Sequence, residues 1–67
     1  MMKIEVNGQV TRLSAGASLQ QLLESMELSD KRLAIEHNME VIPRSAYSRL
    51  QLQDGDRIEI VHAIGGG

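Results

Sequence analysis

The chain of 67 residues contains no cysteine, no tryptophan and no phenylalanine. Without cysteine it can form neither a disulfide framework nor a thiolate zinc site, and it offers no thiol nucleophile. Small secreted domains often depend on disulfides, so we expect a reducing, cytoplasmic location. The two histidines, His37 and His62, have no cysteine and no Glu-x-x-His pattern beside them. We therefore expect no bound metal and no bound cofactor.

The chain also has a small net charge, few aromatic residues and no long apolar run. Seven Lys and Arg residues stand against nine Asp and Glu residues, a formal net charge of -2, and Tyr47 is the one aromatic residue. This composition argues against nucleic-acid binding by a basic patch or by base stacking. No apolar run approaches the roughly 20 residues of a membrane span, and the N-terminus lacks a signal-peptide pattern. A single domain of this size buries only about 60% of its unfolded surface, which argues against a deep catalytic cleft.

Apolar and polar residues alternate in short segments, as they do in half-buried strands. The predicted strands are residues 2–6, 10–13, 33–36, 41–42 and 57–64. Asn7-Gly8 predicts a tight hairpin between the first two, because a type I′ turn needs positive φ at both central positions. Asn38-Met39 marks a second turn, of a type that the pattern leaves open, and Asp54-Gly55-Asp56 marks a third.

One amphipathic helix is predicted between the first hairpin and the third strand. Ser18 and Gln21 match a capping box, in which each side chain satisfies a backbone N–H of the other residue. Apolar residues then recur at the spacing of one helix face; they are Leu19, Leu22, Leu23 and Met26. One such helix can cover one face of a mixed sheet of four or five strands, an α+β fold. A ubiquitin-like β-grasp, with the last strand central in the sheet, satisfies these constraints.

Three consecutive glycines, Gly65, Gly66 and Gly67, follow the last predicted strand. At an average glycine usage of about 7%, such a run at a chosen place has a chance probability of roughly 3 in 10,000. Glycine has no Cβ and stays narrow, and three extended residues reach about 10 Å. We expect residues 1–64 to form the β-grasp domain and residues 65–67 to form a flexible tail. This tail would carry the Gly67 carboxylate into a tunnel on another protein; a frayed end is the alternative.

The parity of the last strand predicts a partner surface. If Ile58 and Ile60 face the helix, Val61 and Ala63 lie on the open face of the sheet, beside the tail. Apolar side chains on a solvated sheet face are typical of an interaction site, whereas ordinary strand propensity is the alternative explanation. We expect Val61, Ala63 and Ile64, at the end of the strand, to contact a partner.

Three segments together resemble the ThiS family, the sulfur carriers of thiamine biosynthesis. They are Val41-Ile42-Pro43-Arg44-Ser45-Ala46-Tyr47, then Leu52-Gln53-Asp54-Gly55-Asp56-Arg57-Ile58-Glu59-Ile60-Val61, and finally Gly66-Gly67. A terminal Gly-Gly is shared by several β-grasp carriers, but the Pro-Arg-Ser-x-aromatic stretch before Asp-Gly-Asp is more specific to this family. The resemblance covers essentially the whole chain, and it implies a protein carrier, monomeric when free, rather than an enzyme.

The resemblance also implies a chemical role for the tail. In the family, an E1-like adenylyltransferase uses ATP and Mg²⁺ to convert the terminal carboxylate into an acyl-adenylate. Sulfur from a cysteine desulfurase then replaces AMP, and thiazole synthase accepts it from the resulting thiocarboxylate. By this resemblance Gly67 bears the sulfur, and Gly65 and Gly66 extend the tail. The alternatives are the small subunit of molybdopterin synthase, a ubiquitin-like protein modifier, and an interaction module whose tail is inert.

Overall fold

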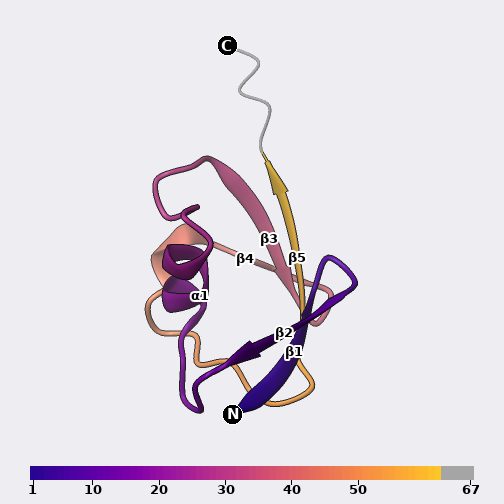
Figure 1. Ribbon diagram of the computed structural model, residues 1–67. Helices are drawn as coiled ribbons and strands as arrows, with labels where there is room; N and C mark the ends of the chain where they lie inside the picture. Colours follow the sequence, from indigo (N-terminus) through magenta and orange to yellow (C-terminus); the bar gives the residue numbers. More distant parts are fainter. Residues whose placement is uncertain (63–67) are drawn as a thin grey trace.

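The computed structural model of the protein describes residues 1–62, so the predicted boundary between residues 1–64 and 65–67 lies outside the described part. Five strands, one α-helix and one 3₁₀ turn follow one another along these residues (Figure 1). They are β1 (Met2–Val6), β2 (Gln9–Leu13), α1 (Leu19–Ser25), β3 (Leu33–His37), β4 (Glu40–Ile42), η1 (Arg44–Ala46) and β5 (Arg57–His62). Each predicted strand is present with its ends shifted by at most one residue. The end predicted for the last strand, residues 63–64, is not described.

The strands form one mixed sheet in the order β2-β1-β5-β3-β4. β1 pairs in parallel with β5, and the other neighbours pair antiparallel. The α+β class, the single helix and the central position of the last strand are therefore as predicted. Helix α1 lies across one face of the sheet, and the other face is left uncovered (Figure 1).

The two hairpin turns share one conformation. Asn7 and Gly8 have φ angles of 50° and 82°, which confirms the type I′ turn between β1 and β2. Asn38 and Met39 also have positive φ, 50° and 73°, so the turn left open by the sequence is of the same type. Met39 is the unusual member, since a long side chain rarely adopts this conformation.

The core lies between α1 and the covered face of the sheet. Its buried residues come from α1, from alternate positions of β1, β3 and β5, and from the segment around η1; they are Met2, Ile4, Val6, Leu19, Leu22, Leu23, Ile35, Tyr47, Leu52, Ile58 and Ile60. The capping box is present, with the Gln21 backbone N–H donating to Ser18 Oγ and the Ser18 backbone N–H donating to Gln21 Oε1. Within residues 1–62, no helix is long and apolar enough to cross a membrane.

The predicted helix face is wrong at Met26. The helix ends at Ser25, and Met26 is 39% exposed. Two backbone bonds end the helix, from the N–H of Leu28 to the carbonyl of Leu23 and from the N–H of Glu27 to the carbonyl of Glu24. This is a Schellman motif, with Glu27 in the left-handed conformation (φ 59°) where glycine is usual. The motif turns the chain, so Leu28 packs against the core in place of Met26.

Candidate functional site

The site begins with β5, the central strand that leads to residues 63–67. Ile58 and Ile60 are buried under α1, whereas Val61 points to the uncovered face and is 62% exposed. The structure thus places Val61 on the open face, as strand parity predicts. Ala63 and Ile64 lie outside the described residues, and so do all three tail glycines, residues 65–67. Contact of these residues with a partner stays a prediction.

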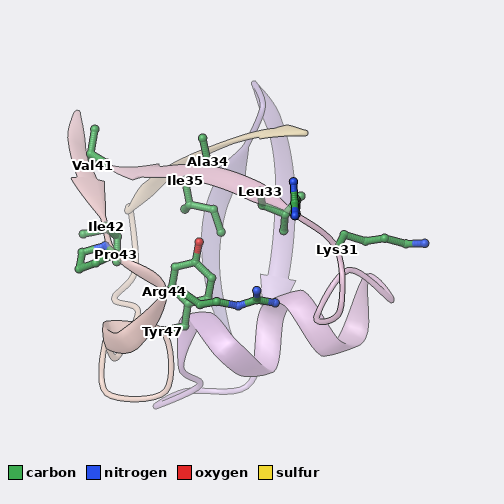
Figure 2. Close-up of a pocket in the computed structure, with 10 residues that line it drawn as sticks. Lys31, Leu33, Ala34, Ile35, Val41, Ile42, Pro43, Arg44 and Tyr47 are labelled. Atoms are coloured by element: carbon green, nitrogen blue, oxygen red, sulfur yellow. The ribbon is translucent and has the colours of Figure 1, made fainter. Parts of the chain in front are cut away.

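Strand register brings two further apolar residues to Val61. Ala34 on β3 is the cross-strand partner of Val61, and Val41 on β4 is the partner of Glu36, two residues along β3. Ala34, Val41 and Val61 line a shallow hollow of about 100 Å³, and we call them the open-face patch. Val41 is 74% exposed. Figure 2 shows Ala34 and Val41 on the side of the sheet opposite to the buried Tyr47.

Two carboxylates border the open-face patch. Glu36 and Glu59 are direct cross-strand partners and line the same hollow. Like charges directly opposite each other destabilise a sheet. Among residues 1–62, the ion pairs join His37 to Asp56 and Arg57 to Glu5, so neither Glu36 nor Glu59 is neutralised there. A basic group on a partner would relieve this repulsion, and the patch therefore fits an apolar surface that carries a lysine or an arginine.

Two asparagine side chains hold β5 from its two sides. The β1–β5 ladder ends at Val6↔Ile58, and the Asn7 side chain continues it. Asn7 Oδ1 accepts from the Ile60 backbone N–H at 2.8 Å, and Asn7 Nδ2 donates to the Ile60 carbonyl at 3.1 Å. On the β3 side, Asn38 Oδ1 accepts from the Arg57 backbone N–H at 2.8 Å. Each asparagine occupies a type I′ turn and also fixes the strand that leads to the tail.

A polar cluster joins the β3–β4 turn to the turn before β5. His37 Nε2 lies 2.8 Å from Asp56 Oδ2, and Asp56 also accepts from Asn38 Nδ2 and from the Gln53 backbone N–H. Burial acts to raise the pKa of Asp56, but the hydrogen bonds from His37, Gln53 and Asn38, together with the charge of His37, outweigh it and lower the pKa. The cluster is structural, and residues 1–62 contain no group of three side chains suited to hold a metal ion.

A model of the ThiS family matches residues 3–67. The chain belongs to the ThiS family. The family match confirms the predicted resemblance, and it extends over the tail glycines that the structure does not describe.

Two bacterial proteins named sulfur carrier protein ThiS are similar to this chain. It is 44% identical over 50 residues to the sulfur carrier protein ThiS of Bacillus subtilis, covering 75% of this chain and 76% of that protein. It is 32% identical over 66 residues to the sulfur carrier protein ThiS of Escherichia coli, covering 98% and 100%. Both names describe a sulfur carrier, the class of protein that the sequence predicted in place of an enzyme.

A crystal structure of the thiamine biosynthesis protein ThiS from Geobacter metallireducens superimposes with a TM-score of 0.85 at 28% identity, covering 98% of this chain and 100% of that one. The predicted fold is thereby confirmed as that of the family. A longer relative is the thiazole synthase of Paramagnetospirillum magneticum, 38% identical over 66 residues. The similar region covers 98% of this chain but 20% of the length of that thiazole synthase.

Proposed function

We propose that this ThiS-family chain is a sulfur carrier of thiamine biosynthesis and that the carboxylate of Gly67 carries the sulfur. The observation that supports this most is the match to the family through Gly67, the last of the three glycines. A carboxylate is a poor acyl donor until one of its oxygens becomes a leaving group. A chain of this kind therefore needs an enzyme partner to activate it, since a domain of 67 residues is small for building a deep catalytic cleft.

The proposed activation follows from that requirement. The Gly67 carboxylate oxygen attacks the α-phosphate of ATP on an E1-like adenylyltransferase, and pyrophosphate leaves. The persulfide sulfur of a cysteine desulfurase then attacks the acyl carbon and expels AMP, and a thiol cleaves the resulting acyl disulfide to leave the thiocarboxylate. The partner enzyme binds and uses the ATP and Mg²⁺, and the carrier itself binds no cofactor. The chain has no cysteine to intercept the activated acyl group.

Thiazole synthase is the proposed acceptor of the sulfur. Thiazole synthases of two bacteria contain a segment similar to this chain, and the chain covers 20% of each. A carrier joined to its acceptor in one polypeptide would meet it at high effective concentration, which favours the same two proteins as partners when they are separate. We further propose that the free carrier is monomeric and cytoplasmic.

The open-face patch is the proposed docking surface for these enzymes. Val61 lies at the end of β5 nearest the tail, and its neighbours Ala34 and Val41 extend the apolar area across three strands. The sequence prediction adds Ala63 and Ile64, which follow β5 in the sequence. The bonds of Asn7 and Asn38 to β5 would fix the direction in which the tail leaves the patch.

The proposal is tested by comparing three proteins in one reaction: the chain ending at Gly67, the Gly67→Ala variant, and a form with one residue added after Gly67. Each is incubated with the adenylyltransferase, ATP, Mg²⁺ and a sulfur source, and its intact mass is measured. One added residue displaces the reactive carbon by about 3.5 Å, and such chemistry is sensitive to displacements of about 1 Å. We expect full modification of the first protein, reduced modification of Gly67→Ala, and none of the extended form.

Full modification of the extended form without trimming would contradict the proposal. Isopeptide adducts on a denaturing gel would instead indicate a protein modifier. Binding to a molybdopterin synthase large subunit in place of thiazole synthase would indicate the other alternative pathway.

A further inference from the structure

A second surface lies at the edge of the sheet, where β3 continues beyond the end of β4. The β3–β4 ladder runs from His37↔Glu40 to Ile35↔Ile42, and Leu33 has no partner in β4. From Pro43 the chain leaves the sheet and enters η1. In an antiparallel ladder, residues two apart direct their backbone groups to the same neighbour. Leu33 therefore directs its N–H and C=O to the side that β4 has left open.

This open edge borders a hollow of about 420 Å³ between β3 and η1. Its walls are apolar where Leu33, Ile35 and Ile42 line it. Figure 2 shows the side chains of Arg44 and Tyr47 close together beneath β3, with the Tyr47 hydroxyl directed toward the strand. Among residues 1–62, no fully buried side-chain nitrogen or oxygen lacks a hydrogen-bond partner. We call this hollow the β3–η1 groove.

Positive charge gathers at the β3–η1 groove although the whole chain is acidic. Lys31, Arg32 and Arg44 line it, three of the seven Lys and Arg residues. None of the three takes part in an ion pair among the described residues. Arg44 Nη2 donates to the Ser29 carbonyl at 3.1 Å. This bond orients the guanidinium and uses one of its five donors.

We propose that the β3–η1 groove binds an extended, acidic segment of a partner protein. The backbone of that segment pairs with the free edge of β3 at Leu33, and one of its Asp or Glu side chains bonds to Arg44. An exposed strand edge is a template for such strand addition. The edge offers a donor and an acceptor together, which a peptide backbone matches and an acceptor-only phosphate group does not.

The apolar walls fit aliphatic residues two positions away from the acidic residue, because those share its face of the added strand. Alternate side chains of an added strand point to one face, so one can reach Ile35 and Ile42 while the strand pairs with Leu33. Ala34 and Val41 of the open-face patch also border this groove, but the proposed contacts at Leu33 and Arg44 need neither Gly67 nor Val61. The binding therefore goes beyond the proposed function and stands or falls separately from it.

The test is an NMR titration of the ¹⁵N-labelled full chain with an end-blocked peptide in which valine and glutamate lie two residues apart, with threonine between them, so that both side chains share one face. Three matched ligands accompany it: the same peptide with glutamine for glutamate, the same peptide with its central amides N-methylated, and inorganic phosphate. We expect saturable shifts at Leu33 and Arg44 with the glutamate peptide, and much weaker binding of the other three. Arg44→Gln should weaken binding of the peptide about two- to fivefold, in line with the loss of one exposed ion pair.

Arg49→Gln is the matched control, since Arg49 is exposed and outside the β3–η1 groove, and it should leave the affinity unchanged. Arg44→Lys should recover part of the affinity, and the spectra themselves report whether each variant is folded. The proposal is overturned if the glutamine or N-methylated peptide binds equally well, if phosphate binds as tightly, or if the shifts centre on Val61. The proposal is also overturned if no saturable shifts appear up to about 1 mM peptide, since a Kd of 1 mM corresponds to a binding free energy of about −4 kcal/mol.

Discussion

Replacement of Asn7 by glycine isolates the contribution of one side chain to the strand that leads to the tail. Glycine adopts the positive φ of this turn without strain, so Asn7→Gly keeps the type I′ turn. It removes only the side-chain amide, and with it both hydrogen bonds to Ile60, at 2.8 and 3.1 Å. The backbone N–H and C=O of Ile60, which face the β1 side, must then form hydrogen bonds with water instead.

The expected loss of stability follows from these two bonds. A typical intramolecular hydrogen bond contributes about 0.5–1.5 kcal/mol net, so two contribute about 1–3 kcal/mol. The extra freedom of glycine in the unfolded chain adds about 0.5 kcal/mol to this loss. A 67-residue domain has a total stability of roughly 3–10 kcal/mol. We therefore expect the free energy of unfolding to fall by about 2 kcal/mol, a large share of the total.

Urea denaturation measures the global loss, and amide hydrogen exchange locates it. In Asn7→Gly, protection of the Ile60 amide should fall more than that of Ile58, which stays in the β1–β5 ladder. Asn38→Gly is the control at the other hairpin turn: Asn38 has the same φ of 50°, and its loss removes the bond from Arg57 and the bond to Asp56 but none to Ile60. Its loss of protection should centre on Arg57. Unchanged protection of Ile60 in Asn7→Gly would refute the role assigned to Asn7.

Three further predictions concern the rest of the domain. The pKa of Asp56 is lower in the folded chain than its usual value of 3.8; its bond to His37 therefore contributes stability above about pH 4, lost as the pH falls through the folded pKa. Acid titration of Asp56→Asn should show a smaller loss over that range than the wild type, and an equal loss would contradict this. Val61→Asp should weaken binding to the adenylyltransferase while changing stability by only about 0.5 kcal/mol; Val10→Asp, at an equally exposed valine (63%) on edge strand β2, is the control, and equal effects of the two on binding would show that the patch is misplaced. Glu27→Gly should raise the free energy of unfolding by about 1 kcal/mol by removing a left-handed side-chain conformation, and an unchanged urea midpoint would count against that strain.

The strands and the helix were predictable because their signals are local. Alternation over residues 2–6, the Asn7-Gly8 pair and the Ser18–Gln21 box each specify the conformation of neighbouring residues. These signals agree with one another, and together they leave few arrangements of one helix and five short strands. Parity within β5 likewise assigned Val61 to the open face without knowledge of the rest of the sheet.

The missed features depend on contacts between distant segments. Asn7 bonds to Ile60, 53 residues away, and nothing near Asn7 distinguishes this role from that of an ordinary turn residue. Ala34 and Val41 join Val61 only through the register of three strands, which the alternation pattern leaves open. Met26 is apolar and continues the helical spacing, but the Schellman motif at Glu27 ends the helix at Ser25. No glycine in the sequence marks that end.

The central claim is that sulfur is carried by the carboxylate of Gly67, and fragmentation mass spectrometry of the modified chain tests it most directly. The chain is incubated with the adenylyltransferase, ATP, Mg²⁺ and an isotopically labelled sulfur source, and then offered to thiazole synthase with its other substrates. We expect one oxygen replaced by labelled sulfur in the C-terminal fragment that contains Gly67, and loss of the label from the carrier as the thiazole product gains it. Label on any internal residue, or a labelled product formed from a chain that lacks Gly66-Gly67, would contradict the account.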